Sequence, residues 1–123
     1  MADPVARARL AWFLELSRWW LGDSHGALTR LERVRDVLRR GGDTWGTAVA
    51  LVSLARTELV QGGLDRARDQ EHEAERVLRV LGDRWGILHA SHVLAQIAEA
   101  RGDLEETARR QGEGLRIALI ARR

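Results

Sequence analysis

Gly42-Asp43-Thr44-Trp45-Gly46 returns later in the chain as Gly82-Asp83-Arg84-Trp85-Gly86. The step from Gly42 to Gly82, below called the repeat offset, relates further pairs of positions: Ala50 and Ala90, Leu54 and Leu94, Ala55 and Ala95, Gly62 and Gly102, Leu64 and Leu104. It also reaches back to Leu14, Gly22 and Leu38. A fixed period of this kind is typical of repeat proteins, in which each unit buries its apolar face against the next. We therefore predict a single domain, residues 1–123, made of three units at about residues 5–41, 45–81 and 85–121.

Each unit has the composition of two helices joined by a short turn. The segments between the glycines are rich in Ala, Leu, Arg and Glu, with apolar residues three and four apart, which favours amphipathic helices. Asp43 and Asp83 follow a glycine and stand where a helix begins, as N-caps do. Gly22, Gly62 and Gly102 fall at the turn within each pair. Connections this short force neighbouring helices to run antiparallel.

The composition excludes several kinds of chemistry. The chain of 123 residues has no cysteine and no tyrosine, and all 20 of its basic residues are arginine. Disulfides, thiolate metal sites, lysine Schiff bases and a Walker-type phosphate loop are therefore ruled out. The net charge of +2 gives little support to nucleic-acid binding. No apolar run approaches the roughly 20 residues of a membrane-spanning helix, and no secretory signal is evident, so we expect a cytoplasmic protein that binds no membrane.

The motif Leu54-Ala55 followed by Gly62-x-Leu64-x-x-Ala67 resembles the core of tetratricopeptide repeats, and the third unit repeats it as Leu94-Ala95 and Gly102-Asp103-Leu104. The linking stretch Leu81–Ile87 resembles the repeats of large bacterial signalling ATPases and of transcriptional activators of the maltose-regulator type. The unit, at about 40 residues, is longer than the roughly 34 residues that are usual in the family. The resemblance implies an all-α, right-handed solenoid of three antiparallel hairpins, about six helices, without a cofactor. Such motifs define a fold better than a function.

One segment departs from the family pattern. Between Asp65 and Leu81, the residues Gln70, Glu71, His72 and Glu73 stand where the family usually has an aromatic or aliphatic residue. We expect this helix to pack more weakly on its neighbours, or its boundary to lie elsewhere.

The resemblance also implies a place for a ligand, because the family builds its concave surface from one face of the first helix of each unit. Carried over to this chain, those positions form a groove that binds a peptide or a partner helix. They are Arg9, Trp12, Leu16, Trp19, Val49, Val52, Arg56, Leu59, His89, His92, Gln96 and Glu99. Tryptophan and arginine are enriched at binding hot spots, and an aromatic trough suits a peptide or an amphipathic helix.

Several of these residues have a second interpretation. Trp12 and Trp19 lie seven apart on one helical face, so they fit either an apolar core or an exposed groove. Trp45 and Trp85 recur in register near helix starts, and we expect them to pack between units. A helical pair such as His89 and His92 can bind a metal, but no third ligand is fixed by sequence, so we predict no metal site.

The last predicted helix is apolar around most of its circumference, whereas solenoids normally end in a helix with a polar outer face. Either further repeats follow it in a longer protein, or this end pairs with another copy of the chain. The residues that we expect to carry self-association are Leu115, Ile117, Leu119 and Ile120.

No arrangement of residues carries a catalytic mechanism, so we expect no enzyme. The leading interpretation is a protein-interaction scaffold, of the kind that forms part of a signalling or transcriptional regulator. Two alternatives remain open. The groove could sense a small effector molecule, or the chain could be a self-assembly module that acts through its terminal helix.

Overall fold

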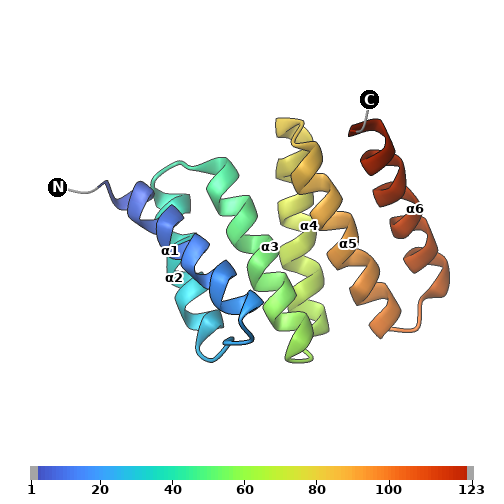
Figure 1. The fold of residues 1–123 in the computed structure, drawn as a ribbon, viewed down its shortest axis with the longest axis horizontal. Coiled ribbons are helices and arrows are strands. Elements are labelled where there is room, and N and C mark those ends of the chain that lie inside the picture. The colour runs from blue at the N-terminus through green and yellow to red at the C-terminus, as the bar shows by residue number, and fades with distance from the viewer. Residues whose placement is uncertain (1–2, 122–123) are drawn as a thin grey trace.

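The protein, described by a computed structural model over residues 3–121, consists of six helices arranged as three hairpins (Figure 1). The helices are α1 (Pro4–Trp20), α2 (Ala27–Arg40), α3 (Thr44–Val60), α4 (Leu64–Leu81), α5 (Arg84–Ala100) and α6 (Leu104–Ala121). Each helix packs against the next along the chain, and the described residues form no strand. The prediction of an all-α stack of helical hairpins is confirmed, and its right-handed sense stays a prediction. None of these helices is both long and apolar enough to cross a membrane.

A glycine with a left-handed backbone conformation ends each of the first five helices, and these glycines are evenly spaced along the chain. Their φ angles lie between 68° and 85°, at Gly22, Gly42, Gly62, Gly82 and Gly102. Glycine adopts this conformation at almost no cost, whereas other L-residues are strained there. The turns are therefore fixed locally, and five of the helices begin in step with them, at positions 4, 44, 64, 84 and 104.

The second helix is the exception to this spacing. A longer loop, which contains a second left-handed glycine at Gly26 (φ 72°), delays the start of α2 until Ala27. The register of the unit is nevertheless kept, because Ala27 occupies the position of Ala67 and Thr107, and all three are buried. The loop thus shortens α2 by about one turn without moving its packing face.

The first helix of every hairpin begins at an aspartate that caps it. The carboxylates of Asp3, Asp43 and Asp83 accept hydrogen bonds from the backbone N–H groups of Val5 (3.1 Å), Gly46 (2.9 Å) and Gly86 (3.0 Å). Each bond satisfies a backbone donor that has no partner inside the helix.

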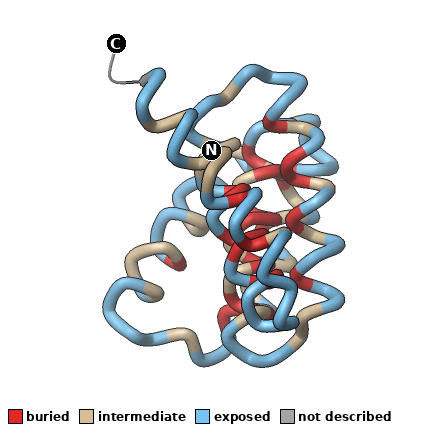
Figure 2. The backbone as a smooth tube through the Cα atoms, turned by 90° about the vertical axis from the view of Figure 1, so that its right-hand side faces the viewer, coloured by how far each residue is buried: buried red, intermediate tan, exposed pale blue. Residues whose placement is uncertain are grey.

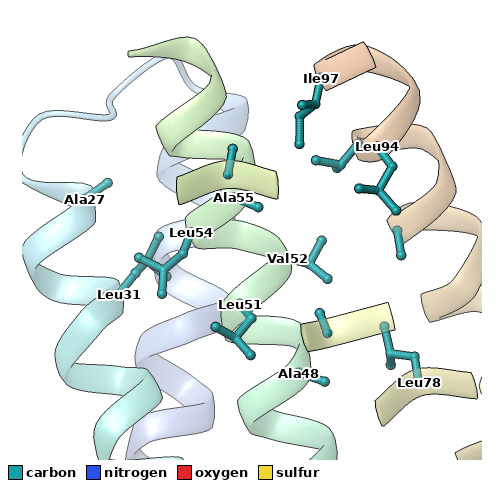
Figure 3. Close-up of a cluster of buried hydrophobic side chains, with 14 residues drawn as sticks. Ala27, Leu31, Ala48, Leu51, Val52, Leu54, Ala55, Leu78, Leu94 and Ile97 are labelled. Carbon is teal, nitrogen blue, oxygen red and sulfur yellow. The ribbon is translucent and has the colours of Figure 1, made fainter. Parts of the chain in front are cut away.

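The apolar core runs through the stack between the two layers of helices and is densest around α3 (Figures 2 and 3). Leu51, Leu54 and Ala55 are almost completely buried there, together with Leu78 of α4 and Val93 of α5. The middle hairpin has a neighbour on both sides, which explains why α3 is apolar on nearly all of its faces.

The second helices of successive hairpins are joined by ion pairs that recur at the repeat offset. Arg39 of α2 bonds Glu73 of α4 at 2.6 Å, and Arg79 of α4 bonds Glu113 of α6 at 2.5 Å. The period seen in the sequence is therefore also a period of tertiary contacts.

The expectation that the helix near residues 65–81 packs weakly, or is misplaced, is wrong. It spans Leu64–Leu81 and packs against both α3 and α5. Glu71 is completely buried in the position that Leu31 occupies in the first hairpin. The side chain that breaks the family pattern is thus accommodated inside the protein.

Candidate binding groove

The first helices of the three hairpins, α1, α3 and α5, form a hollowed face, with α3 contacting both of the others. Two adjoining cavities lie on it, with volumes of about 150 Å³ and about 440 Å³. Leu16, Arg56 and His89 line both cavities, so the two are parts of one groove. Arg56 also lines a much smaller hollow beside the α1–α2 loop, which places this side chain at the centre of the face.

The structure brings together ten of the twelve residues predicted to line the groove. The ten are Trp12, Leu16, Trp19, Val49, Val52, Arg56, Leu59, His89, His92 and Gln96. Arg9 and Glu99 do not line either cavity. Both are exposed, and the guanidinium of Arg9 is held by the carboxylate of Asp43 through bonds of 2.5 Å and 2.8 Å.

Trp12 belongs both to the core and to the groove, so its two interpretations do not exclude one another. Its half-buried ring packs on the apolar core and meets the ring of Trp45 edge to face, with centroids 6.2 Å apart. Its Nε1–H donates to the hydroxyl oxygen of Ser53 at 2.9 Å. This bond fixes the ring orientation, because a buried indole N–H needs an acceptor.

Trp45 packs between repeats as predicted, whereas the same prediction for Trp85 is wrong. The indole N–H of Trp45 donates to Asp83 at 2.9 Å, which ties α3 to the cap of α5. Trp85 has 69% of its surface exposed, and its ring meets the edge of His89, one turn further along α5. Among residues 3–121 no further hairpin follows α6, so Trp85 has no neighbouring cap to bond.

Arg56 is the cation at the centre of the groove, and it makes no hydrogen bond or ion pair within the described chain. Partial burial lowers the pKa of its guanidinium, and the nearby carboxyl of Glu71 opposes this shift. Both carboxyl oxygens of Glu71 are buried without a hydrogen-bond partner. Burial raises the pKa of Glu71 well above its usual range, with Arg56 acting in the other direction. The carboxyl of Glu71 therefore influences the guanidinium of Arg56 without forming a hydrogen bond or an ion pair with it.

The polar end of the groove holds two histidines. Burial lowers the pKa of His89, and the positive charge of Arg56 and the neighbouring His92 lower it further. The ring of His89 is therefore neutral near pH 7, and it offers one donor and one acceptor. Within the described part of the chain, no three His, Asp or Glu side chains come close enough together to hold a metal ion.

The prediction from sequence missed eight residues that line the groove: Trp20, Trp45, Ser53, Val60, Leu78, Asp83, Trp85 and Gly86. Trp45 precedes Val49 by four positions, and Trp85 precedes His89 by four, so both continue the predicted helical face by one turn. Because Trp45 and Trp85 recur at the repeat offset, they were assigned to packing between units and not to the groove.

The residues predicted for self-association lie on more than one face of α6. Leu115, Leu119 and Ile120 are exposed, with 62%, 51% and 50% of their surfaces accessible. Ile117 is half-buried. Which contacts these side chains make with another molecule stays a prediction.

No family model matches the chain, and neither the curated proteins nor the solved structures contain a match. The resemblance to tetratricopeptide repeats therefore remains a prediction from the motifs, and the description of the groove depends on its geometry alone.

Proposed function

We propose that this protein is a cytoplasmic, non-enzymatic interaction module that holds a segment of a partner protein in the groove of α1, α3 and α5. The observation that carries the proposal is Arg56, an unpaired and partly desolvated cation at the junction of the hollows. A desolvated charge without a partner is costly, and an incoming carboxylate removes that cost.

The walls of the groove specify the rest of the ligand. Trp12, Trp45 and Trp85 line its smaller cavity, and Trp19 and Leu59 line the larger one. Tryptophan supplies a large apolar contact area at little cost in side-chain entropy. The partner segment should therefore carry an acidic residue flanked by apolar or aromatic side chains. A scaffold with this specificity would suit the sensor or arm region of a signalling or transcriptional regulator.

The proposal can be tested by selecting peptides from a random display library on the purified protein. Selected peptides should be enriched in Asp or Glu beside an apolar residue. Their affinity, measured by calorimetry, should fall about 10- to 100-fold on Arg56→Gln, since a hydrogen bond to a charged group contributes about 1.5–3 kcal/mol. Arg33→Gln is the matched control, because Arg33 is an exposed arginine of α2 that lies outside the groove.

Trp85→Ala should also weaken binding, and it should leave the thermal stability unchanged because the ring is mostly exposed. Peptides that bind Arg56→Gln as tightly as the wild type would refute the proposal. If free carboxylic acids in a metabolite screen raised the melting temperature and no peptide were selected, the groove would be an effector site instead.

A further inference from the structure

We propose that α6 forms a two-fold symmetric, antiparallel pair with α6 of a second copy of the chain. The face in question is a stripe of residues, spaced three and four apart, along the outer side of the helix. It consists of Leu104, Ala108, Gln111, Gly112, Leu115 and Leu119, and below we call it the α6 stripe. All of them are exposed except Gly112, which is half-buried. Residues at this spacing share one helical face.

The α6 stripe is the face that the earlier hairpins use to contact the hairpin that follows them. At the repeat offset, Leu115 corresponds to Glu75 and Leu119 corresponds to Arg79. In α4, Glu75 bonds Arg110 and Arg79 bonds Glu113, both on α6. In α6 the same face is apolar and exposed at the end of the stack (Figure 1; Figure 2 looks at the molecule from this side).

A second α6 is chemically the best occupant of this face, because the stripe is symmetric about its own centre. The centre of the stripe lies between Gln111 and Gly112, and its residues form pairs at equal distances on either side of that point. The pairs are 111 and 112, 108 and 115, and 104 and 119. In an antiparallel pair, Leu104 therefore meets Leu119 of the partner copy, and Ala108 meets Leu115. The small residues Ala108 and Gly112 allow the two helices to approach closely.

The charged residues beside the α6 stripe are also complementary to those of a second copy. Glu105 and Arg116 lie on the same flank, both are exposed, and neither forms an ion pair within the described residues. Antiparallel helices bring the same flanks together, so Glu105 of one copy lies beside Arg116 of the other, and the two-fold axis makes this contact twice. Opposite charges at such positions set the orientation and register of paired helices.

Head-to-tail stacking of copies fits the chemistry less well. In such a stack, α1 of the next copy would cover the α6 stripe as α5 covers α4, and the exposed Leu10, Phe13 and Leu14 of α1 would supply apolar contacts. The position of Glu113, which accepts the bond from Arg79, is held in the first hairpin by Arg33. Leu119 would then lie beside an arginine that has no carboxylate partner, so this stack lacks the ion pairs that the antiparallel arrangement provides.

The expected association is reversible and weak. An 18-residue helix is about 27 Å long, so a pair of them makes an interface at the small end of the range, for which transient contacts are usual. We expect a dissociation constant between about 1 and 100 µM by sedimentation equilibrium.

Leu115→Glu and Leu119→Glu should each weaken the dimer at least about tenfold. Val80→Glu is the control, since Val80 is an exposed apolar residue of α4 outside the stripe.

Two kinds of variant test the antiparallel register itself. Glu105→Arg and Arg116→Glu should each weaken the dimer, and the double exchange should restore it. The chain has no cysteine, so Gln111→Cys introduces a single thiol close to the proposed axis. Under mild oxidation it should form a disulfide-linked dimer, whereas Leu104→Cys alone should not.

Three results would overturn the proposal. The wild type could remain a monomer at about 1 mM, or its dimer could be unaffected by Leu115→Glu. The third is a disulfide-linked dimer formed by Leu104→Cys and not by Gln111→Cys. Loss of peptide binding in the groove would leave these results unchanged, because the two surfaces are separate.

Discussion

Replacing Glu71 by leucine should stabilise the protein, although it removes a charged residue from a chain held together by many ion pairs. Glu71 is fully buried, and neither of its carboxyl oxygens has a hydrogen-bond partner. The equivalent position of the first hairpin, Leu31, shows that the fold accepts a leucine there with only 2% of its surface exposed.

The size of the effect follows from two contributions. An unsatisfied buried polar group costs about 1–3 kcal/mol, and burying a leucine side chain contributes about 1.5–3 kcal/mol. Imperfect packing of the new side chain offsets part of this, by about 1–3 kcal/mol. We therefore expect Glu71→Leu to increase the free energy of unfolding by about 2 kcal/mol near pH 7, or the melting temperature by about 6–10 °C.

The effect should depend on pH in a defined direction. The folded-state pKa of Glu71 is raised, so as pH rises above the ordinary glutamate pKa of about 4.3, the unfolded chain releases a proton that the folded chain retains. The wild type therefore loses stability with rising pH, by at most about 1.4 kcal/mol per pH unit, until the folded-state pKa is passed. Glu71→Leu lacks this loss, so its advantage should widen from pH 5 to pH 8.

Urea unfolding followed by circular dichroism at pH 5 and pH 8 measures both quantities. Glu71→Gln is the control, because it removes the ionisation and keeps a polar side chain of the same shape. It should abolish the widening with pH and provide little of the apolar gain. If Glu71→Leu unfolded at lower urea than the wild type at pH 8, Glu71 would be ionised and paired with Arg56, and the reasoning would be refuted.

Three further results are expected from the contacts described above. Arg110→Met should destabilise the protein by about 1.5–3 kcal/mol in urea melts, because the buried carboxylate of Glu75 loses its 2.5 Å bond to Arg110 and keeps only the longer ion pair with Arg79, at 3.4 Å; an unchanged midpoint would contradict this. Asp83→Ala should cost about 1–2 kcal/mol by removing the cap of α5 and the acceptor of Trp45, whereas Asp83→Asn should cost less than half as much. Gly62→Ala should lower stability by about 1–2 kcal/mol through its φ of 85° alone, since open space surrounds the site; thermal melts of Gly62→Asn should show a smaller loss.

Most of the fold was predictable because its signals are local. Left-handed glycines and capping aspartates act within a few residues of themselves, so Gly42-Asp43 and Gly82-Asp83 define helix ends without any tertiary information. The repeat offset then predicts that the units stack, since a hairpin cannot bury its apolar face alone. The late start of α2 was harder to predict, because a glycine such as Gly26 indicates a turn but does not define how long the turn is.

The sequence predicted which residues share the groove face, but it did not predict which of the charged residues on that face have partners. Spacing along a helix places Val49, Val52 and Arg56 on one side of α3. It does not reveal that Arg9 is held by Asp43 while Arg56 has no partner, because those facts depend on residues from different hairpins. Pairing between side chains far apart in sequence is decided only when the hairpins dock.

The sequence by itself thus determined where the helices of this protein begin and end, and the interval at which its hairpins repeat, because backbone conformation and capping are short-range. The tertiary structure alone decided which charges are satisfied. Glu71 and Glu75 lie one turn apart on α4 and both are buried, yet Arg110 meets the carboxylate of Glu75, while that of Glu71 finds no hydrogen-bond donor. That difference arises from the positions of α3 and α6 around the same helix, and it leaves Arg56 as an unpaired cation in the groove.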